Sequence, residues 1–171
     1  MGLKDNSAIV SIGIVEFDET TIGRQFYVNV DLQSCLDVGL VTDQSTIDWW
    51  NQQSEEAQSA WKKDPVSLTE GLTQLNRFFE LGTGGLASMR LWGNGAGFDN
   101  VLLKNAYKAV GADEPWKYYN NRCYRTMAAV FGLDPEEQPA RVGTYHNALD
   151  DAITQTLRLQ AICKKYGISL S

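Results

Sequence analysis

The stretch of residues 87–111 constrains the fold of this chain more than any other segment. Its first part, "ASMRLWGNG", is largely apolar and ends in glycines, which is typical of a buried strand. The residues that follow a short turn, "DNVLLKNAYKAVG", are typical of a helix that Gly111 closes. A strand, a glycine turn and a helix in this order indicate an α/β protein.

An antiparallel hairpin is predicted near the N-terminus. Residues 7–18, "SAIVSIGIVEFD", are rich in β-branched side chains, and residues 23–32, "GRQFYVNVDL", alternate between apolar and polar side chains. The residues "DETTIG" between them are typical of a turn. Asp18 and Glu19 are adjacent, so on a strand they would point to opposite faces, and we expect them to be turn residues.

Capping-box patterns mark the starts of two predicted helices. Ser45 with Asp48 opens "STIDWWNQQ", and Ser67 with Glu70 opens a later helix. Between them, residues 54–61, "SEEAQSAW", predict a further short helix. The later helix carries an apolar stripe that should pack on a sheet: Leu68, Leu72, Leu75 and Phe79.

The remaining segments continue the alternation of strands, helices and loops. Residues 80–85, "ELGTGG", and residues 135–145, "PEEQPARVGTY", predict loops, and residues 116–132, "WKYYNNRCYRTMAAVFG", predict a short strand followed by a helix. A final helix is expected from about Asn147 to Tyr166. Its apolar side would hold Ala148, Ala152, Leu159 and Ile162.

Length and composition predict one domain that spans residues 1–171. The chain has 171 residues, of which 43% are hydrophobic, and this suffices for one compact core. No apolar run approaches the ~18 residues that cross a bilayer, and the N-terminus lacks the pattern of a signal peptide. We therefore expect a cytoplasmic protein without membrane contact. The three cysteines, Cys35, Cys123 and Cys163, are far apart, which favours free buried thiols.

The formal net charge of −6 limits the classes of partner. It argues against a protein that coats a long nucleic-acid duplex, because such binding depends on many phosphate contacts. It does not exclude a short phosphodiester substrate. Carboxylates that hold divalent cations present positive charge to phosphate.

Asp99 lies where the glycine turn meets the following helix. Gly93, Gly95 and Gly97 are spaced like part of a dinucleotide-binding fingerprint, but Phe98 stands where that fingerprint needs its last glycine. The simplest role for Asp99 is that of an N-cap whose carboxylate accepts free backbone N–H groups.

His146 is the single histidine, and it precedes two adjacent carboxylates, Asp150 and Asp151. A structural role is open for all three, because acids favour the positive end of a helix dipole. If the last helix includes His146, Asp150 shares its face. If His146 lies just before the first turn, Asp151 can point into a site with it.

The combination of these segments resembles a known family. "NGAGFD" at residues 94–99, followed by the H-x4-D pattern from His146 to Asp151, resembles the second and third motifs of the DEDDh 3′-5′ exonucleases. That family includes proofreading exonucleases, ribonuclease T and oligoribonuclease. The resemblance to its compact bacterial and phage branch runs from about Ile9 to the end of the last helix. Four segments carry it in order: "STIDWWNQQSEEA", "LWGNGAGFDNVLL", "PWKYYNNRCYRT" and "HNALDDAITQ".

The resemblance implies a ribonuclease H-like fold, in which helices flank a mixed β-sheet, and the hydrolysis of phosphodiester bonds at single-stranded DNA or RNA 3′ ends. Asp99 and Asp151 match ligands of two Mg²⁺ or Mn²⁺ ions, and His146 matches the general base that takes a proton from the attacking water. These assignments suit the chemistry, since hard cations prefer carboxylate oxygens and imidazole is the commonest general base. The resemblance leaves a monomer and a homodimer both open.

The first motif of the family, D-x-E on a strand before "AIVSIG", has no counterpart here. Asp5 is a single acid in a polar leader and cannot replace a pair. Relative to the family pattern the chain is N-terminally truncated, and Met1 would correspond to an internal methionine just after that motif. The alternatives are completion by another segment and an inactive relative. The missing strand would lie centrally, between the hairpin and the strand that ends at Trp92, so its neighbours should carry unpaired backbone groups.

Four side chains are candidates for substrate binding. Trp49 and Trp50 could stack on nucleobases, although at least one of them could instead belong to the core. Phe98 could wedge against a terminal base or pack under the turn, and Asn94 lies in the same motif. Arg125 could meet a phosphate or pair with a local carboxylate.

Two other functions are weighed against an exonuclease. One is a catalytically inactive, exonuclease-like module that binds nucleic acid or protein. The other is a thiol hydrolase that uses a cysteine with His146 and an aspartate, although no cysteine lies at a recognisable nucleophile turn.

Overall fold

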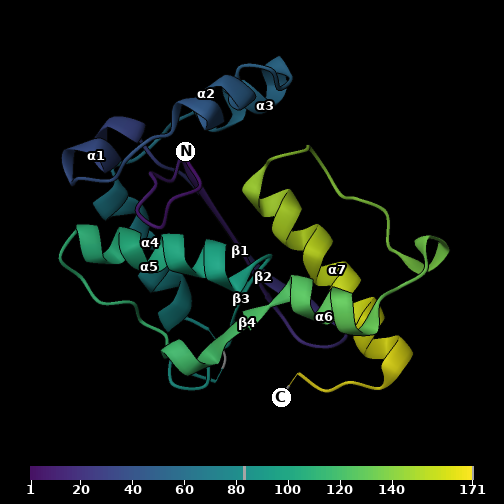
Figure 1. Ribbon diagram of the computed structural model, residues 1–171. Coiled ribbons are helices and arrows are strands. Elements are labelled where there is room, and N and C mark those ends of the chain that lie inside the picture. Colours follow the sequence, from purple (N-terminus) through teal and green to yellow (C-terminus); the bar gives the residue numbers. More distant parts are fainter. Residues whose placement is uncertain (83, 171) are drawn as a thin grey trace.

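The computed structural model describes residues 1–82 and 84–170, apart from the side chain of Glu56. Helices surround two small β-sheets, and this confirms the predicted α/β class (Figure 1). The predicted loop 80–85 includes Thr83, which lies outside the described residues.

The predicted hairpin is confirmed. β1 (Ser11–Phe17) pairs antiparallel with β2 (Ile22–Asn29), in a register that runs from Ser11↔Asn29 to Phe17↔Ile22. The carboxylate of Asp18 accepts the backbone N–H groups of Thr20 (2.8 Å) and Thr21 (2.7 Å), so it holds the turn as expected. The first strand begins at Ser11, four residues later than its sequence pattern suggests.

A second, parallel sheet joins β3 (Leu91–Gly93) to β4 (Asn121–Cys123). The buried Asn100 holds the two strands together. Its Nδ2 donates to the carbonyl of Leu91 (2.9 Å) and to Oδ1 of Asn121 (2.8 Å). Within the described part of the chain, the two sheets do not pair with each other.

Four helices follow the hairpin: α1 (Leu32–Asp37), α2 (Gln44–Trp50), α3 (Glu55–Ala60) and α4 (Leu68–Glu80). The predicted cap of α4 is confirmed, because the hydroxyl of Ser67 accepts the N–H of Glu70 (3.2 Å). All four residues of the predicted apolar stripe are buried. Gly71 of α4 faces Val28 and Val30, so this helix packs on the hairpin as expected.

The predicted start of α2 is wrong. Its N-cap is Asp43, whose carboxylate accepts the N–H (3.0 Å) and the hydroxyl (2.8 Å) of Ser45. An aspartate caps at least as well as a serine, so the helix begins one residue before Ser45 instead of after it. Asp48 accepts a hydrogen bond from Gln44 and does not close a box with Ser45. The short helix α3 is confirmed, with Ser54 as its N-cap.

The second half of the chain follows the predicted order. α5 (Val101–Ala109) comes after a π-helical turn, η1 (Ala96–Asn100), and α6 (Tyr124–Phe131) comes after β4. Single 3₁₀ turns occupy Tyr118–Asn120 and Pro135–Glu137, the latter inside the predicted loop 135–145. The last helix, α7 (Ala148–Tyr166), matches its predicted range and buries Leu159 and Ile162.

The cysteines are free, as predicted. Cys35 and Cys163 are buried, whereas Cys123 is half-buried. Across residues 1–82 and 84–170, no helix has both the length and the apolar composition that crossing a membrane requires.

The first turn of α7 packs directly on the backbone of β1. A Cβ atom at Gly13 would lie 2.3 Å from the carbonyl carbon of Ala148 and 2.3 Å from the nitrogen of Leu149. Both contacts are with backbone atoms, which cannot rotate away as a side chain could. Glycine at this position therefore sets how closely the start of α7 approaches the hairpin.

Replacing Gly13 by alanine should push α7 away from β1. Overpacking of this kind destabilises a protein by about 1–3 kcal/mol, so we expect the free energy of unfolding, measured with urea, to fall by that amount. Gly97→Ala is the matched control, because a Cβ there meets nothing within 4 Å. Equal stability of the two variants would show that α7 can shift without cost.

Candidate functional site

His146 lies just outside α7. The helix begins at Ala148, and its N-cap Asn147 accepts the N–H groups of Leu149 (3.0 Å) and Asp150 (3.2 Å) through Oδ1. His146 has a φ of 66°, which is uncommon for a residue other than glycine. Of the two geometries that the sequence left open, the structure has the one in which the histidine precedes the first turn.

The ring of His146 contacts the two tryptophans at the end of α2. Its centroid lies 4.8 Å from that of Trp49 and 6.0 Å from that of Trp50, both edge-on. The loop before α7 thus reaches the end of α2, as the approach of these elements in Figure 1 also shows. The structure brings together three candidate residues that are far apart in sequence.

Arg141 braces the loop that carries His146. Its Nη2 donates to the carbonyl of Thr144 (2.8 Å) and to the carboxylate of Asp151, and its guanidinium lies 4.1 Å from the ring centroid of Tyr145. The carboxylate of Asp151 is therefore engaged in an ion pair, on a side chain that is 34% exposed.

Asp150 braces the same loop from the other side. Its Oδ2 accepts the N–H of Thr144 (2.7 Å). A Cβ at Gly143 would lie 2.1 Å from this oxygen, and the φ of 64° at Gly143 also favours glycine. Burial raises the pKa of the nearby Tyr27 hydroxyl, and the charge of Asp150 adds to this rise. Both adjacent acids of α7 thus hold the loop, in addition to any other role.

Asp99 lies on the π-helical turn η1 and is exposed. Its Oδ2 accepts the N–H of Gly95 (2.8 Å), so the carboxylate closes its own turn and does not cap α5. A Cβ at Gly93 would lie 2.4 Å from Oδ1 of Asn100 and 3.0 Å from Cβ of Asp99. The glycine after Trp92 therefore lets this turn fold back onto the end of β3.

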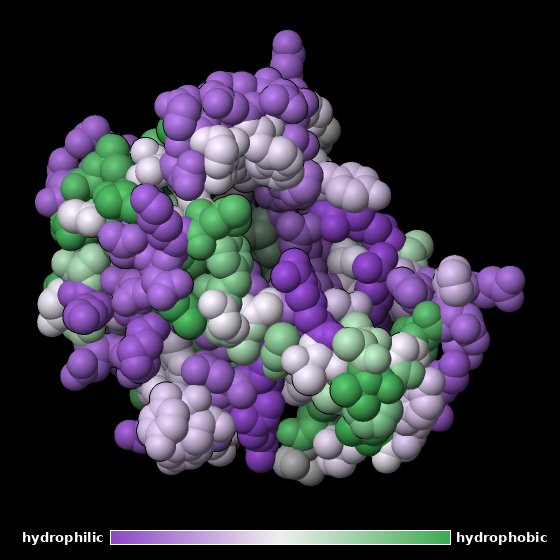
Figure 2. Space-filling model, viewed as in Figure 1, coloured by the Kyte–Doolittle hydropathy of each residue, from purple (hydrophilic) through white to green (hydrophobic). Residues whose placement is uncertain are grey.

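An aromatic cavity of about 560 Å³ lies between the N-terminal residues, the end of α2 and the start of α5. Trp49, Trp50 and Phe98 line it. Trp49 is 40% exposed and Phe98 is 38% exposed, while Trp50 is half-buried. Neither tryptophan is among the fully buried core residues, although Trp50 is partly buried, and the side chain of Phe98 is exposed. Figure 2 shows this face of the molecule hollowed at its centre, beneath α2 and α3.

Asn94 is not among the residues that line this cavity, and its backbone contacts β4 and α6 instead. Its carbonyl accepts the N–H of Arg125 (3.0 Å) and the thiol of Cys123 (3.8 Å).

A hydrogen bond with the hydroxyl of Thr126 lowers the pKa of Cys123. Burial raises the pKa of Cys35 and of Cys163. His146 contacts aromatic rings, so the structure gives no support to a cysteine–histidine pair.

The acids near the site offer oxygen ligands of the kind that Mg²⁺ prefers. Among the residues that the structure describes, no group of three or more His, Cys, Asp or Glu side chains could hold a metal ion. Mg²⁺ is commonly held by one or two carboxylates together with water and substrate phosphate. Asp99 and Asp151 carry the type of oxygen ligand that such a site needs. To bind the cation, Asp151 would have to give up its ion pair with Arg141.

Sequence reasoning missed several residues that position the site. Gly13, Arg141 and Asn100 each act through a contact with a distant or differently folded segment. Arg141 lies in the predicted loop 135–145 and carries no local pattern. Only the position of Asn100, directly after Asp99, could have drawn attention to it.

Comparisons with known proteins identify a matching family and a phage relative. The family model of the 3'-5' exoribonuclease Rv2179c-like domain matches residues 1–163. The chain is also similar to an exodeoxyribonuclease of Enterobacteria phage T4, with 25% identity over 191 aligned positions that cover 94% of this chain and 84% of the relative. No solved structure matches the chain significantly.

Removing the guanidinium of Arg141 should loosen the loop before α7. In Arg141→Met the hydrogen bonds to Thr144 and Asp151 are lost, so amide exchange of residues 142–147 should accelerate by about tenfold, or about 1.4 kcal/mol. Hydrogen-exchange mass spectrometry measures this directly. Lys165→Met, which breaks an ion pair with Glu137 at the other end of α7, should leave these amides unchanged. Exchange that is equally slow in both variants would contradict the bracing role.

Proposed function

The chain belongs to the 3'-5' exoribonuclease Rv2179c-like domain family, and from that premise we propose that it is a metal-dependent 3′-5′ exonuclease acting on single-stranded nucleic-acid ends. One observation carries the proposal. The ring of His146 lies against Trp49 and Trp50, which line the same cavity as Phe98, the neighbour of Asp99. Trp49, Trp50 and Phe98 thus line one cavity that is large enough for a nucleobase, and His146 contacts two of the aromatic side chains that line it. The α/β architecture agrees with a ribonuclease H-like fold, which we include in the proposal.

His146 is the proposed general base. His146 has a left-handed backbone conformation and lies outside the helix. Arg141 and Asp150 hold its loop in place. An imidazole in such a position can accept a proton from a water molecule that attacks the scissile phosphate. The edge-on contacts with the two tryptophans orient the ring.

Trp49, Trp50 and Phe98 are the proposed binding surface for the terminal nucleotide. Every base has a π-face, so stacking on aromatic side chains tolerates any sequence. A base in this cavity would lie beside Asp99, and Asn94 lies in the same turn region. This arrangement favours a single-stranded end, because the bases of a duplex are already stacked on one another.

Asp99 and Asp151 are the proposed protein ligands of Mg²⁺ or Mn²⁺. Such ions neutralise phosphate charge and stabilise both the attacking and the leaving oxygen. The two carboxylates would hold the cation, which would supply this charge stabilisation at the scissile phosphate. Arg141, once released from Asp151, can pair with a phosphate oxygen.

Whether the enzyme prefers RNA or DNA depends on how its binding site accommodates the 2′-hydroxyl of the substrate. The matched family is named for exoribonucleases, whereas the phage relative is named an exodeoxyribonuclease. The exposed aromatic surface recognises bases and does not distinguish the two sugars. The activity assay should therefore use matched RNA and DNA oligonucleotides in parallel.

Three substitutions test the catalytic roles. His146→Ala should lower kcat by about 10²- to 10⁴-fold, the usual contribution of a general base, and Asp99→Asn and Asp151→Asn should lower it at least as much. The assay follows shortening of 5′-labelled single strands with Mn²⁺, and EDTA should abolish it. Asp113→Asn, an exposed acid away from the site, is the control. If His146→Ala is as active as the unmodified chain, His146 is not the base.

Truncation of Trp49 tests the binding surface. Stacking contributes ~1–3 kcal/mol per base, so Trp49→Ala should weaken oligonucleotide binding by roughly 5- to 150-fold. Fluorescence anisotropy of a labelled oligonucleotide with Ca²⁺ in place of Mn²⁺ measures binding. Tyr118→Ala, a 75% exposed aromatic away from the cavity, should not change it. Equal affinities of the two variants would place the substrate elsewhere.

A second candidate is an inactive module that binds nucleic acid through the same surface. The ion pair between Asp151 and Arg141 favours it, because this carboxylate already has a cationic partner. The two candidates differ in turnover. The module would bind oligonucleotides, lose affinity in Trp49→Ala, and release no nucleotide at any concentration of Mg²⁺ or Mn²⁺.

A further inference from the structure

Tyr145 presents an exposed aromatic ring next to the proposed general base. The residue is 66% exposed, and its ring centroid lies 6.2 Å from that of His146. Tyr145 is not among the residues that line the aromatic cavity, whereas Trp49, which contacts His146 from another direction in the sequence, is. The ring contacts of Trp49, His146 and Tyr145 are thus connected, and they extend from the cavity to the surface outside it.

Arg141 fixes the ring of Tyr145 from one side. The guanidinium carbon lies over the ring, 4.1 Å from its centroid, and Nη2 of the same group donates to Thr144 and Asp151. A guanidinium covers only one face of a ring, so the exposure of Tyr145 leaves the opposite face for a ligand. A ring that is already held in place loses little conformational freedom when a ligand stacks on it.

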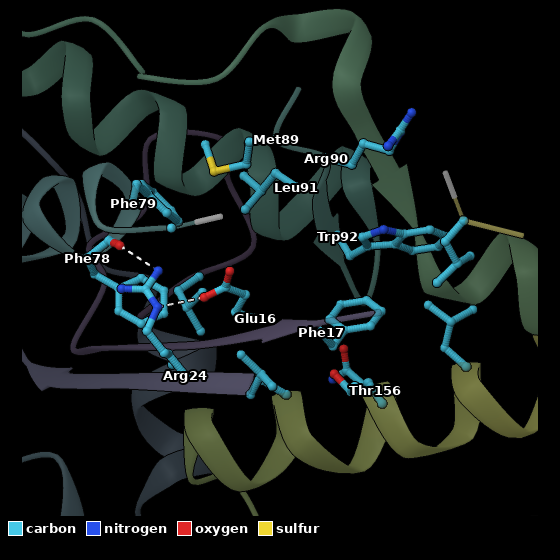
Figure 3. Close-up of a pocket in the computed structure, with 18 of the residues that line it drawn as sticks. Glu16, Phe17, Arg24, Phe78, Phe79, Met89, Arg90, Leu91, Trp92 and Thr156 are labelled. Carbon is cyan, nitrogen blue, oxygen red and sulfur yellow. Dashed lines mark hydrogen bonds and ion pairs between the residues drawn. The ribbon is translucent and has the colours of Figure 1, made fainter. Parts of the chain in front are cut away.

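A second cavity, of about 360 Å³, does not continue the aromatic cavity. Within the described residues the two cavities share no lining residue. Figure 3 shows that Arg24, in the second cavity, is bonded to Glu16 and to the carbonyl of Phe78, so this cation already has partners there. The surface that continues the aromatic cavity is therefore the one past His146.

The proposed chemistry determines which nucleotide meets this surface. The scissile phosphate joins the terminal nucleotide to the penultimate one, and His146 as general base must lie beside that phosphate. With the terminal base against Trp49, the penultimate base lies past His146. We infer that Tyr145, backed by Arg141, is the stacking site for the penultimate base of the substrate. The inference rests on the proposed function, and it makes the preferred substrate a strand with bases at both of its last two positions.

The stack is compatible with the proposed release of Arg141 from Asp151. Arginine can stack on an aromatic ring while its N–H groups pair with a carboxylate or a phosphate. Here the ring contact is made through Cζ and the ion pair through Nη2. Exchange of the carboxylate for a phosphate oxygen at Nη2 therefore leaves the contact with Tyr145 in place. The site accepts any base, because every base has a π-face.

Two dinucleotides measure stacking at the penultimate position. Both carry a 5′-phosphate and the same pyrimidine as the 3′-terminal base, but one has adenine at the penultimate position and the other is abasic there. Each is made with ribose and with deoxyribose, and the sugar that binds more tightly is used. Isothermal titration calorimetry with Ca²⁺ in place of Mn²⁺ gives both affinities. We expect the adenine dinucleotide to bind roughly 5- to 150-fold more tightly than the abasic one.

The ratio of these two affinities identifies the stacking residue. In Tyr145→Ala the ratio should fall to about one, whereas Tyr145→Phe should retain it, because stacking needs the ring and not the hydroxyl. Tyr166→Ala is the matched control. Tyr166 is 44% exposed and has the ammonium of Lys165 over its ring at 5.4 Å, but it lies at the other end of α7. Its removal should leave the ratio unchanged.

The ratio also separates stacking from a structural role. If Tyr145 only supported Arg141, Tyr145→Ala would weaken both dinucleotides equally and keep the ratio, and this result would overturn the inference. Equal affinities of the two dinucleotides for the unmodified chain would overturn it as well. So would a failure of both dinucleotides to bind at millimolar concentration when the longer oligonucleotide binds. If the oligonucleotide does not bind either, the proposed function itself is wrong, and the inference is lost with it.

Discussion

The contact between Gly13 and the first turn of α7 governs the position of the site. Because no side chain separates the two backbones, the start of α7 lies directly on β1. The loop that carries His146 ends at this turn, and its bracing by Asp150 and Arg141 starts from there. A displacement of the turn would move the imidazole away from Trp49. A packing requirement inside the hairpin is thus linked to the chemistry at the surface.

The carboxylates of the site have structural partners as well as proposed chemical roles. Asp99 closes its own turn on Gly95, Asp150 holds Thr144, and Asp151 pairs with Arg141. Each of these bonds fixes a loop near the aromatic cavity. The exchange of Arg141 for a cation at Asp151 would connect metal binding to the mobility of the His146 loop.

Local patterns predicted most elements of the fold. The hairpin, the cap of α4 and its buried stripe followed from periodicity and capping chemistry, which act within a few residues. The cap of α2 was misplaced because Asp43 and Ser45 compete for the same helix start, and the pattern alone does not rank them. The separation of β1 from β3 agrees with the gap that the family pattern led us to expect between them.

The sequence by itself determined the chemical groups and their local settings: an imidazole and two acids at the start of α7, and an aspartate in a glycine turn after β3. These depend on short-range bonding, so spacing along the chain reveals them. Only the tertiary structure decided that Trp49 and Trp50 reach His146, that Phe98 faces the same cavity, and that Arg141 holds Asp151. Those contacts join segments whose relative placement depends on how α2 and α7 pack around the hairpin, and no periodicity records such packing.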